Sequence, residues 1–278
     1  MSYANPNALV STDWLAENLD NPDIRIIEVD EDVTLYEKNH IPGAIAWSWS
    51  DDLHHPVRRD YLDQSGFSGL LAAAGVEPDT TVILYGGNNN WFAAYAYWLL
   101  KYRGFDKVKL LDGGRKKWQL ESLPLDSEVP VLASSDFAIA GEERPEIRAF
   151  RDQVLSSLGT ATFVDVRSPE EFSGEKLAPE HLPQEQPYVA GHIPGAKNVP
   201  WGKTANEDGT FKTADELRAI YDNAGVDGGE IISYCRIGER SSHTWFVLTE
   251  LLGQAGVKNY DGSWTEYGSL VDVPVERG

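Results

Sequence analysis

The chain has 278 residues, 41% of them hydrophobic, and a formal net charge of −20 at pH 7, so it is long enough for two domains with well-filled cores. The acidic excess argues against a nucleic-acid partner, which normally requires a basic surface patch. The longest apolar run, residues 91–100, is about half of the ~20 residues that cross a bilayer, and the N-terminal residues lack the pattern of a signal peptide. We therefore expect no nucleic-acid partner and no membrane partner.

The chain contains two similar halves. The segment His-Ile-Pro-Gly-Ala occurs at residues 40–44 and again at residues 192–196. A second match pairs residues 81–85 with residues 230–234, and the halves continue from there without gaps. A period near 150 residues is too long for a solenoid repeat and indicates a duplicated domain.

The expected domain boundaries follow from this repeat. We predict a first domain over residues 8–125 and a second over residues 147–278. Residues 126–146 are rich in proline, serine and acidic residues, show little periodicity, and are expected to be the linker.

Short apolar segments that are typical of strands alternate with helix-like segments in each half. Residues 162–166 read as a strand, and Ser168 then begins a helix as part of a capping box. Thr213 begins a second capping box, and a strand over residues 231–234 precedes a helix over residues 241–252. Such alternation predicts the α/β class, with each domain a mostly parallel sheet flanked by helices and a ligand site at the carboxyl ends of strands.

The single cysteine, Cys235, directly follows the strand over residues 231–234. A lone cysteine cannot form an internal disulfide, which is typical of a cytoplasmic protein. Arg236 and Arg240 flank a glycine-containing turn at a predicted helix start, and both features lower the pKa of a thiol. We therefore expect Cys235 to be a nucleophilic thiolate at neutral pH without a histidine base, and His243 to be a packed helix residue.

The first half lacks these groups at the matching positions. Gly86, Gly87 and Trp91 stand where the second half has its cysteine and its two arginines. We therefore predict that the first domain is catalytically inactive.

With these residues in view, the chain resembles the rhodanese family over nearly its whole length, as two tandem domains of which the second is catalytic. The sequence C-R-I-G-E-R-S at residues 235–241 is similar to the C-R-x-G-x-R-[ST] loop of thiosulfate sulfurtransferases. The segments at residues 192–195 and 260–264 also resemble the family.

The resemblance implies a double-displacement reaction. Cys235 attacks the outer sulfur of thiosulfate, sulfite leaves, and a persulfide forms that cyanide, a thiol or a protein sulfur acceptor then consumes. No cofactor and no metal are implied. With one cysteine in the chain, no internal disulfide can resolve the persulfide, so the sulfur must pass to another molecule.

The resemblance also assigns the residues around the nucleophile. Arg240 and Arg236 are expected to bind the sulfonate oxygens, and Arg167 is a further candidate, although an ion pair with Asp165 that fixes the loop is an equally good interpretation. The remaining active-site loop residues are Ile237, Gly238, Glu239 and Ser241. Residues 174–189 have no counterpart in the first half, and we interpret them as a surface loop near the site.

Three other functions stay open. Transfer from 3-mercaptopyruvate is the main alternative, although relatives with that preference tend to have Gly-Ser or Gly-Thr after the cysteine, where this chain has Arg236. A phosphatase or an arsenate reductase would have five residues between its cysteine and arginine, whereas four separate Cys235 from Arg240. A non-catalytic sulfur-carrying module is the third possibility.

Overall fold

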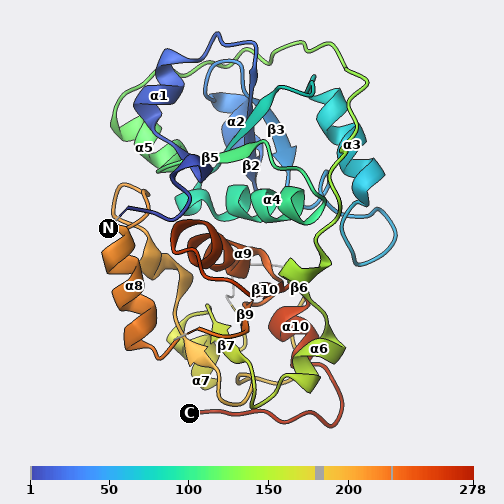
Figure 1. Cartoon of the computed structure of the whole chain (residues 1–278), viewed down its shortest axis with the longest axis vertical. Coiled ribbons are helices and arrows are strands. Elements are labelled where there is room, and N and C mark those ends of the chain that lie inside the picture. Colours follow the sequence, from blue (N-terminus) through green and yellow to red (C-terminus); the bar gives the residue numbers. More distant parts are fainter. Residues whose placement is uncertain (1, 179–184, 227) are drawn as a thin grey trace. The chain divides into compact units, whose positions relative to one another are not determined.

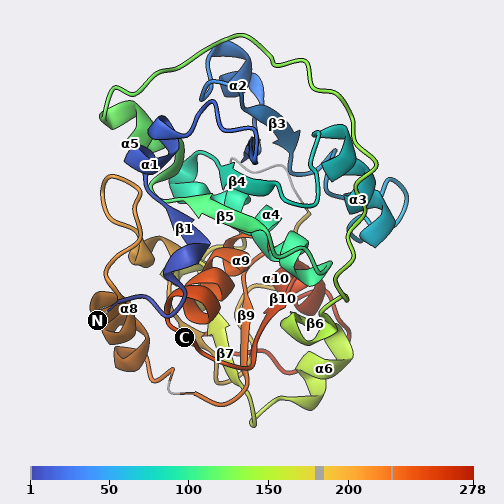
Figure 2. The ribbon, with the colours of Figure 1, turned by 45° about the horizontal axis from the view of Figure 1, so that its top comes forward.

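The computed structural model describes residues 2–178, 185–226 and 228–278, and it divides into two compact units. The first unit consists of Asn7–Arg144 together with Ala205–Phe211. The second unit consists of Pro145–Thr204 and Lys212–Gly278, together with the residues that precede Asn7. Figures 1 and 2 show strands and helices alternating along the chain in both units.

The first unit contains a five-stranded parallel sheet in the order β1-β5-β4-β2-β3. Its strands are β1 (Leu9–Val10), β2 (Ile24–Asp30), β3 (Ile45–Ser48), β4 (Thr81–Tyr85) and β5 (Val108–Leu111). Its α-helices are α1 (Thr12–Glu17), α2 (Thr34–Lys38), α3 (Gln64–Ala73), α4 (Trp91–Tyr102) and α5 (Gly114–Leu120). Two segments are 3₁₀-helices, η2 (Asn88–Asn90) and η1 (Pro6–Ala8), and the first residue of η1 belongs to the second unit.

The second unit repeats this topology with the strand order β6-β10-β9-β7-β8, again all parallel. Its strands are β6 (Arg148–Ala149), β7 (Thr162–Asp165), β8 (Lys197–Asn198), β9 (Ile231–Tyr234) and β10 (Val257–Tyr260). Its α-helices are α6 (Arg151–Ser156), α7 (Pro169–Ser173), α8 (Ala214–Asn223), α9 (Glu239–Phe246) and α10 (Ser263–Tyr267). The 3₁₀-helices η3 (Pro145–Ile147) and η4 (Trp201–Thr204) and the π-helix η5 (Val247–Leu251) complete it. The predicted α/β class with a parallel sheet in each half is confirmed.

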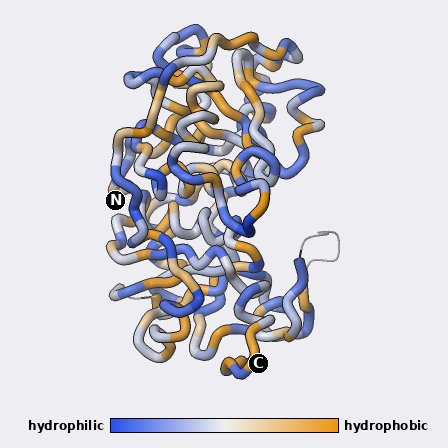
Figure 3. The backbone as a smooth tube through the Cα atoms, turned by 90° about the vertical axis from the view of Figure 1, so that its right-hand side faces the viewer, coloured by the Kyte–Doolittle hydropathy of each residue, from blue (hydrophilic) through white to orange (hydrophobic). Residues whose placement is uncertain are grey.

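Each unit buries its own hydrophobic core around its sheet. Leu15, Tyr85 and Trp118 belong to the core of the first unit, and Ile232 and Trp264 to that of the second. Figure 3 shows hydrophobic and hydrophilic stretches alternating along the backbone, as expected for elements with a buried side and an exposed side.

Both predicted capping boxes are present. The Ser168 hydroxyl accepts the N–H of Glu171 at the start of α7, and the Thr213 hydroxyl accepts the N–H of Glu216 at the start of α8. The helix expected to begin at residue 241 instead begins at Glu239, because Gly238 adopts a left-handed conformation with φ of +97° and serves as its N-cap.

The contacts of two segments differ from the predicted boundaries. Residues 126–144, expected to be a linker, cluster with the first unit, where the N–H of Ser135 donates to the carbonyl of Ala72. Ala205–Phe211, expected within the second domain, also clusters with the first unit, and the N–H of Phe211 donates to Asp112 Oδ1 at 2.9 Å.

Residues 179–184, which form the middle of the segment that has no counterpart in the first half, lie outside the described residues. Within the described parts of the chain, no helix combines the length and the apolar character that crossing a bilayer would require.

Candidate active site

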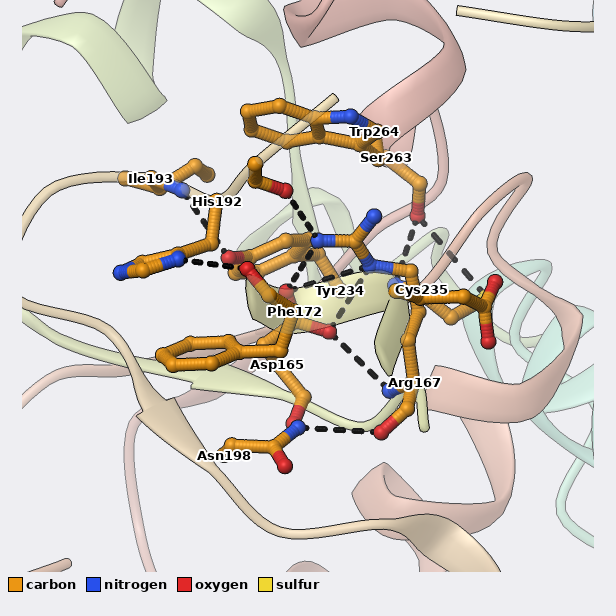
Figure 4. A network of polar contacts seen from close by, with 12 residues as sticks. Asp165, Arg167, Phe172, His192, Ile193, Asn198, Tyr234, Cys235, Ser263 and Trp264 are labelled. Carbon is orange, nitrogen blue, oxygen red and sulfur yellow. Dashed lines mark hydrogen bonds and ion pairs between the residues drawn. The ribbon is translucent and has the colours of Figure 1, made fainter. Parts of the chain in front are cut away.

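Cys235 lies at the carboxyl end of β9, in the turn that leads into α9 (Figure 4). Its side chain is fully buried, and the N–H of Gly238 donates to its sulfur at 3.1 Å. A Cβ atom at position 238 would lie 2.6 Å from the Cα atom of Asp261, so this turn requires glycine. The backbone therefore directs a hydrogen-bond donor at the sulfur, as an anion-binding loop does.

The start of α10 holds the cysteine turn in place. The Ser263 hydroxyl accepts the N–H of Cys235 at 3.0 Å, and its oxygen lies 4.0 Å from the sulfur. The N–H groups of Trp264 and Thr265 donate to the carbonyls of Cys235 and Arg236, each at 3.0 Å. Ser263 is not among the predicted site residues, although it lies in the segment at residues 260–264 that resembles the family.

The most unexpected group at the site is the carboxylate of Glu239. It is 2% exposed, and its Oε2 atom lies 3.5 Å from the sulfur of Cys235. Burial raises the pKa of the Cys235 thiol, and the negative charge of Glu239 adds to this rise, while Arg240 and Ser241 oppose it. The expectation of a thiolate at neutral pH without a histidine base considered the arginines and the helix start, and it left out burial and a neighbouring acid, both of which act in the opposite direction.

Arg240 is bound within the protein. Its guanidinium donates to both carboxylate oxygens of Glu171, at 2.9 and 3.1 Å, and its Nε atom lies 3.9 Å from Glu239 Oε1. Burial acts to raise the pKa of Glu171, but the bond to Arg240 leaves that pKa below its ordinary value. The charge of Arg240 thus lies close to the cysteine turn, but two of its N–H groups already donate to Glu171. The sequence indicated Glu171 only as part of a capping box.

Arg236 offers a different geometry. Its Nε and Nη2 atoms donate to the backbone carbonyl of Glu185, at 3.1 and 2.9 Å. Its side chain is buried, and its Nη1 group has no hydrogen-bond acceptor among residues 2–178, 185–226 and 228–278. A buried guanidinium N–H without an acceptor is costly unless an anion or water satisfies it.

The side chain of Arg167 is engaged by its neighbours (Figure 4). It donates to Asp165 through Nε and Nη2 and to the carbonyl of Gly191 at 2.7 Å, and its guanidinium carbon lies 4.9 Å from the centre of the Trp264 ring. These contacts favour the interpretation of Arg167 as half of an ion pair that fixes the loop over its interpretation as a substrate ligand.

The other predicted loop residues support the turn. Ser241 donates to Asn259 Oδ1 at 2.6 Å and to the carbonyl of Gly238 at 3.1 Å, and Ile237 lies between the Cys235 and Gly238 positions that form the contact with the sulfur. His243 is buried, with its ring 5.2 Å from that of Trp201 in an edge-on contact, as expected for a packed helix residue.

In the matching turn of the first unit, the side chain of Asn90 occupies the inside of the turn. Asn90, which matches Glu239 in the repeat, is fully buried. Its Oδ1 atom accepts the N–H of Gly86 at 3.0 Å, and its Nδ2 atom donates to the carbonyl of Leu111 at 2.6 Å. The turn therefore has neither a nucleophile nor a cation of its own at the matching positions, and the N–H of Gly86 is satisfied by Asn90 and that of Gly87 by Asp30.

Comparison with known proteins agrees with this geometry. The family model described as "Rhodanese-like domain" matches residues 11–121 and again residues 151–270. A protein of Mycolicibacterium smegmatis named "putative thiosulfate sulfurtransferase" is 59% identical over 99% of both chains. The "sulfur carrier protein TtuD" of Thermus thermophilus is 51% identical over 100% of this chain and 99% of its own.

Among solved structures, the 3-mercaptopyruvate sulfurtransferase SseA of Escherichia coli superposes with a TM-score of 0.77. It is 31% identical, and the match covers 92% of this chain and 98% of that protein. The duplicated parallel sheets, the cysteine turn of the second unit and these matches lead to one conclusion: the chain belongs to the rhodanese family, with two tandem rhodanese-like domains.

Proposed function

We propose that this protein is a thiosulfate sulfurtransferase, which takes the outer sulfur of thiosulfate onto Cys235 and passes it to a nucleophilic acceptor. The observation that carries the proposal is the buried turn in which the N–H of Gly238 donates to the cysteine sulfur, and in which the residue after the cysteine, Arg236, has a buried guanidinium N–H without an acceptor in the described parts of the chain. Membership of the rhodanese family and the names of the relatives support sulfur transfer.

The reaction proceeds in two displacements. The thiolate of Cys235 forms a bond to the outer sulfur of thiosulfate, the bond between the two thiosulfate sulfurs breaks, and sulfite leaves with the electron pair. A persulfide remains on Cys235, stabilised by the N–H of Gly238. Cyanide, a thiol or a protein acceptor then attacks the outer sulfur of this persulfide and regenerates Cys235.

The two arginines of the loop have different roles in this proposal. Arg236 binds a sulfonate oxygen of thiosulfate through Nη1, because that group is buried and lacks an acceptor in the described residues. Arg240 contributes positive charge, which lowers the pKa of the Cys235 thiol while its guanidinium stays bound to Glu171. A local cation is needed because the chain carries a net charge of −20 and thiosulfate is an anion.

Two observations define the open choices within sulfur transfer. The similarity to the mercaptopyruvate enzyme of Escherichia coli favours 3-mercaptopyruvate as the alternative donor. The similarity to a protein named as a sulfur carrier favours a protein as the acceptor in the second displacement.

An assay with two donors tests the proposal. Wild type, Cys235→Ala and Arg236→Met are given thiosulfate or 3-mercaptopyruvate at matched concentrations, with cyanide as the acceptor. We expect wild type to turn over thiosulfate faster and Cys235→Ala to be inactive with either donor. Arg236→Met is expected to raise the KM for thiosulfate about tenfold or more, because a charged hydrogen bond contributes roughly 1.5–3 kcal/mol. Faster turnover of 3-mercaptopyruvate by wild type would contradict the assignment of the donor.

A further inference from the structure

Cys235 and Glu239 bring two titratable groups together out of contact with solvent. The two side chains are 0% and 2% exposed, and the sulfur lies 3.5 Å from Glu239 Oε2, with the thiol as donor and the carboxylate as acceptor. Two buried anions at this separation repel each other strongly. The pair therefore favours a single shared proton, held by one group or the other.

The charges that face this pair are few. Arg240 lies on the same helix, with its Nε atom 3.9 Å from Glu239 Oε1, and it is itself bound to Glu171 of α7. Arg236 in the turn is the other cation that acts on Glu239. From α10, the neutral hydroxyl of Ser263 lies 4.0 Å from the sulfur. The two arginines, balanced by the one carboxylate of Glu171, can hold one negative charge on the cysteine–glutamate pair.

We propose that Glu239 is a catalytic residue that accepts the proton of the Cys235 thiol when the sulfur attacks its donor. This inference rests on the proposed sulfur transfer and deepens it. Among the described residues that contact the sulfur, Glu239 alone carries a carboxylate, and the other contacts are the N–H of Gly238, the hydroxyl of Ser263, and the N–H and hydroxyl of Ser241. No histidine is needed in this role, in agreement with the packed position of His243.

The proton balance of the first displacement is then complete. The S–H bond of Cys235 breaks and its proton passes to Glu239 Oε2, while the sulfur bonds to the outer sulfur of thiosulfate. The bond between the two thiosulfate sulfurs breaks with its electron pair on the departing sulfite. Glu239 returns the proton to sulfite, so that a thiol and thiosulfate give a persulfide anion and hydrogen sulfite.

The first unit supports this assignment from the same structural position. There Asn90 matches Glu239, and it fills the turn with a carboxamide that does not titrate between pH 2 and 12. In the second unit the matching N–H, that of Cys235, donates to Ser263 instead, so the frame of the turn does not depend on a charge at position 239. The acid is present where the nucleophile is present and is replaced where the nucleophile is absent.

The test compares the pH dependence of two reactions of Cys235 in wild type, Glu239→Gln, Glu239→Asp and the exposed control Glu175→Gln. The first reaction is alkylation by iodoacetamide, and the second is release of sulfite in a single turnover with thiosulfate. A pair that shares one proton keeps a constant fraction of thiolate between its two titrations. We therefore expect a pH-independent plateau in the alkylation rate of wild type, Glu239→Asp and Glu175→Gln.

Glu239→Gln should have no plateau. Its alkylation rate is expected to follow one titration, with a change of about tenfold per pH unit below the thiol pKa. Its release of sulfite is expected to fall roughly 10²-fold at pH 6 and to recover as the pH rises, as for loss of a general base. A merely structural role for Glu239 would instead reduce both reactions by the same factor at every pH.

A single titration in wild type, or a loss in Glu239→Gln that does not change with pH, would overturn the inference. The profiles of wild type and Glu239→Asp decide the matter even when Glu239→Gln fails to fold. The alkylation experiment also separates this inference from the proposed function. A plateau without any release of sulfite from thiosulfate would contradict the donor and leave the shared proton in place.

Discussion

The turns at residues 86–91 and 235–240 occupy the same position in the two units, yet only the second contains a cysteine and an acidic residue. Each turn follows a central strand and precedes the helix that packs on that strand. In the first unit Asn90 bonds to the backbone of Gly86 and closes the turn upon itself. In the second unit the sulfur of Cys235 takes the N–H of Gly238, and a buried acid replaces the asparagine. The two turns thus share a frame and differ in a few side chains.

A second comparison between the units concerns the ion pair that Arg167 forms with Asp165. Glu28 and Asp165 each lie opposite a tyrosine of the neighbouring strand in the sheet register, and both acidic residues are buried. In the first unit the balancing guanidinium comes from Arg115 on α5, and in the second it comes from Arg167 with Trp264 against it. Because each unit contains a buried ion pair of this kind, the comparison favours a structural role for Arg167.

Breaking the buried pair of Arg240 and Glu171 should have the largest effect on stability. Arg240→Met leaves the Glu171 carboxylate buried without its partner, so we expect a loss of about 3–5 kcal/mol in the free energy of unfolding. Arg115→Met, which strands Glu28 in the first unit, should cost a similar amount and leave sulfite release by the folded protein nearly unchanged. Chemical unfolding followed by circular dichroism measures both variants.

The cause of this loss can be checked within the same pair. Adding Glu171→Gln to Arg240→Met removes the stranded charge and should restore part of the stability. A double variant that is less stable than Arg240→Met would contradict the buried charge as the cause.

Adding a side chain at Gly86, in the turn of the first unit, should have a smaller effect on stability. A Cβ atom at Gly86 would lie 2.4 Å from the carbonyl oxygen of Val29, so Gly86→Ala is expected to cost about 1–3 kcal/mol. Gly69 in α3 has no atom within 4 Å of such a Cβ, and Gly69→Ala should be neutral or stabilising by about 0.5–1 kcal/mol. Thermal unfolding compares the two variants, and equal effects would contradict the close approach at Gly86 as the cause.

The smallest effect concerns two matching aspartates. Asp261 is bound by Arg148 at 2.8 and 3.0 Å, whereas Asp112 accepts the N–H of Phe211. Burial raises the pKa of Asp112 to about 6, with the N–H of Phe211 opposing the rise and Asp208 adding to it. An unfolded aspartate has a pKa near ~3.9, so between about pH 4 and 6 the folded state binds more protons at this site than the unfolded state.

The contribution of Asp112 to stability therefore falls as the pH rises through this window. We expect Asp112→Asn to flatten the pH dependence of the unfolding free energy between about pH 4 and 6, and to stabilise the protein by about 1–2 kcal/mol at pH 8. Denaturant unfolding at a series of pH values measures this change. An unchanged slope in that window would show that Asp112 does not titrate there.

The sequence predicted the parts of the structure that are set locally or by repetition. The capping boxes at Ser168 and Thr213 follow from side chains three residues apart, and the parallel sheets follow from alternating strands and helices. The position of Cys235 directly after a strand follows from the apolar segment that precedes it. The repeat singled out this cysteine, because the first half has a matching strand and turn but no cysteine.

The contacts between distant residues could not be predicted in this way. Glu171 meets Arg240 across 69 positions of sequence, and Ser263 meets Cys235 across 28, so no local pattern links them. Glu239 lies in the motif itself, but its effect on the thiol depends on burial, which the sequence does not reveal. The linker at residues 126–146 was predicted from composition. Composition cannot show that residues 126–144 pack with the first unit.

Mass spectrometry of the intact protein after incubation with thiosulfate tests the central claim most directly. We expect wild type to gain one sulfur atom, located on the peptide that contains Cys235, and to lose it when cyanide is added. Cys235→Ala should gain none, because the first unit has no nucleophile at the matching position. A wild type that gains no sulfur, or a Cys235→Ala variant that still gains one, would contradict the division of the chain into a scaffold unit and a sulfur-carrying unit.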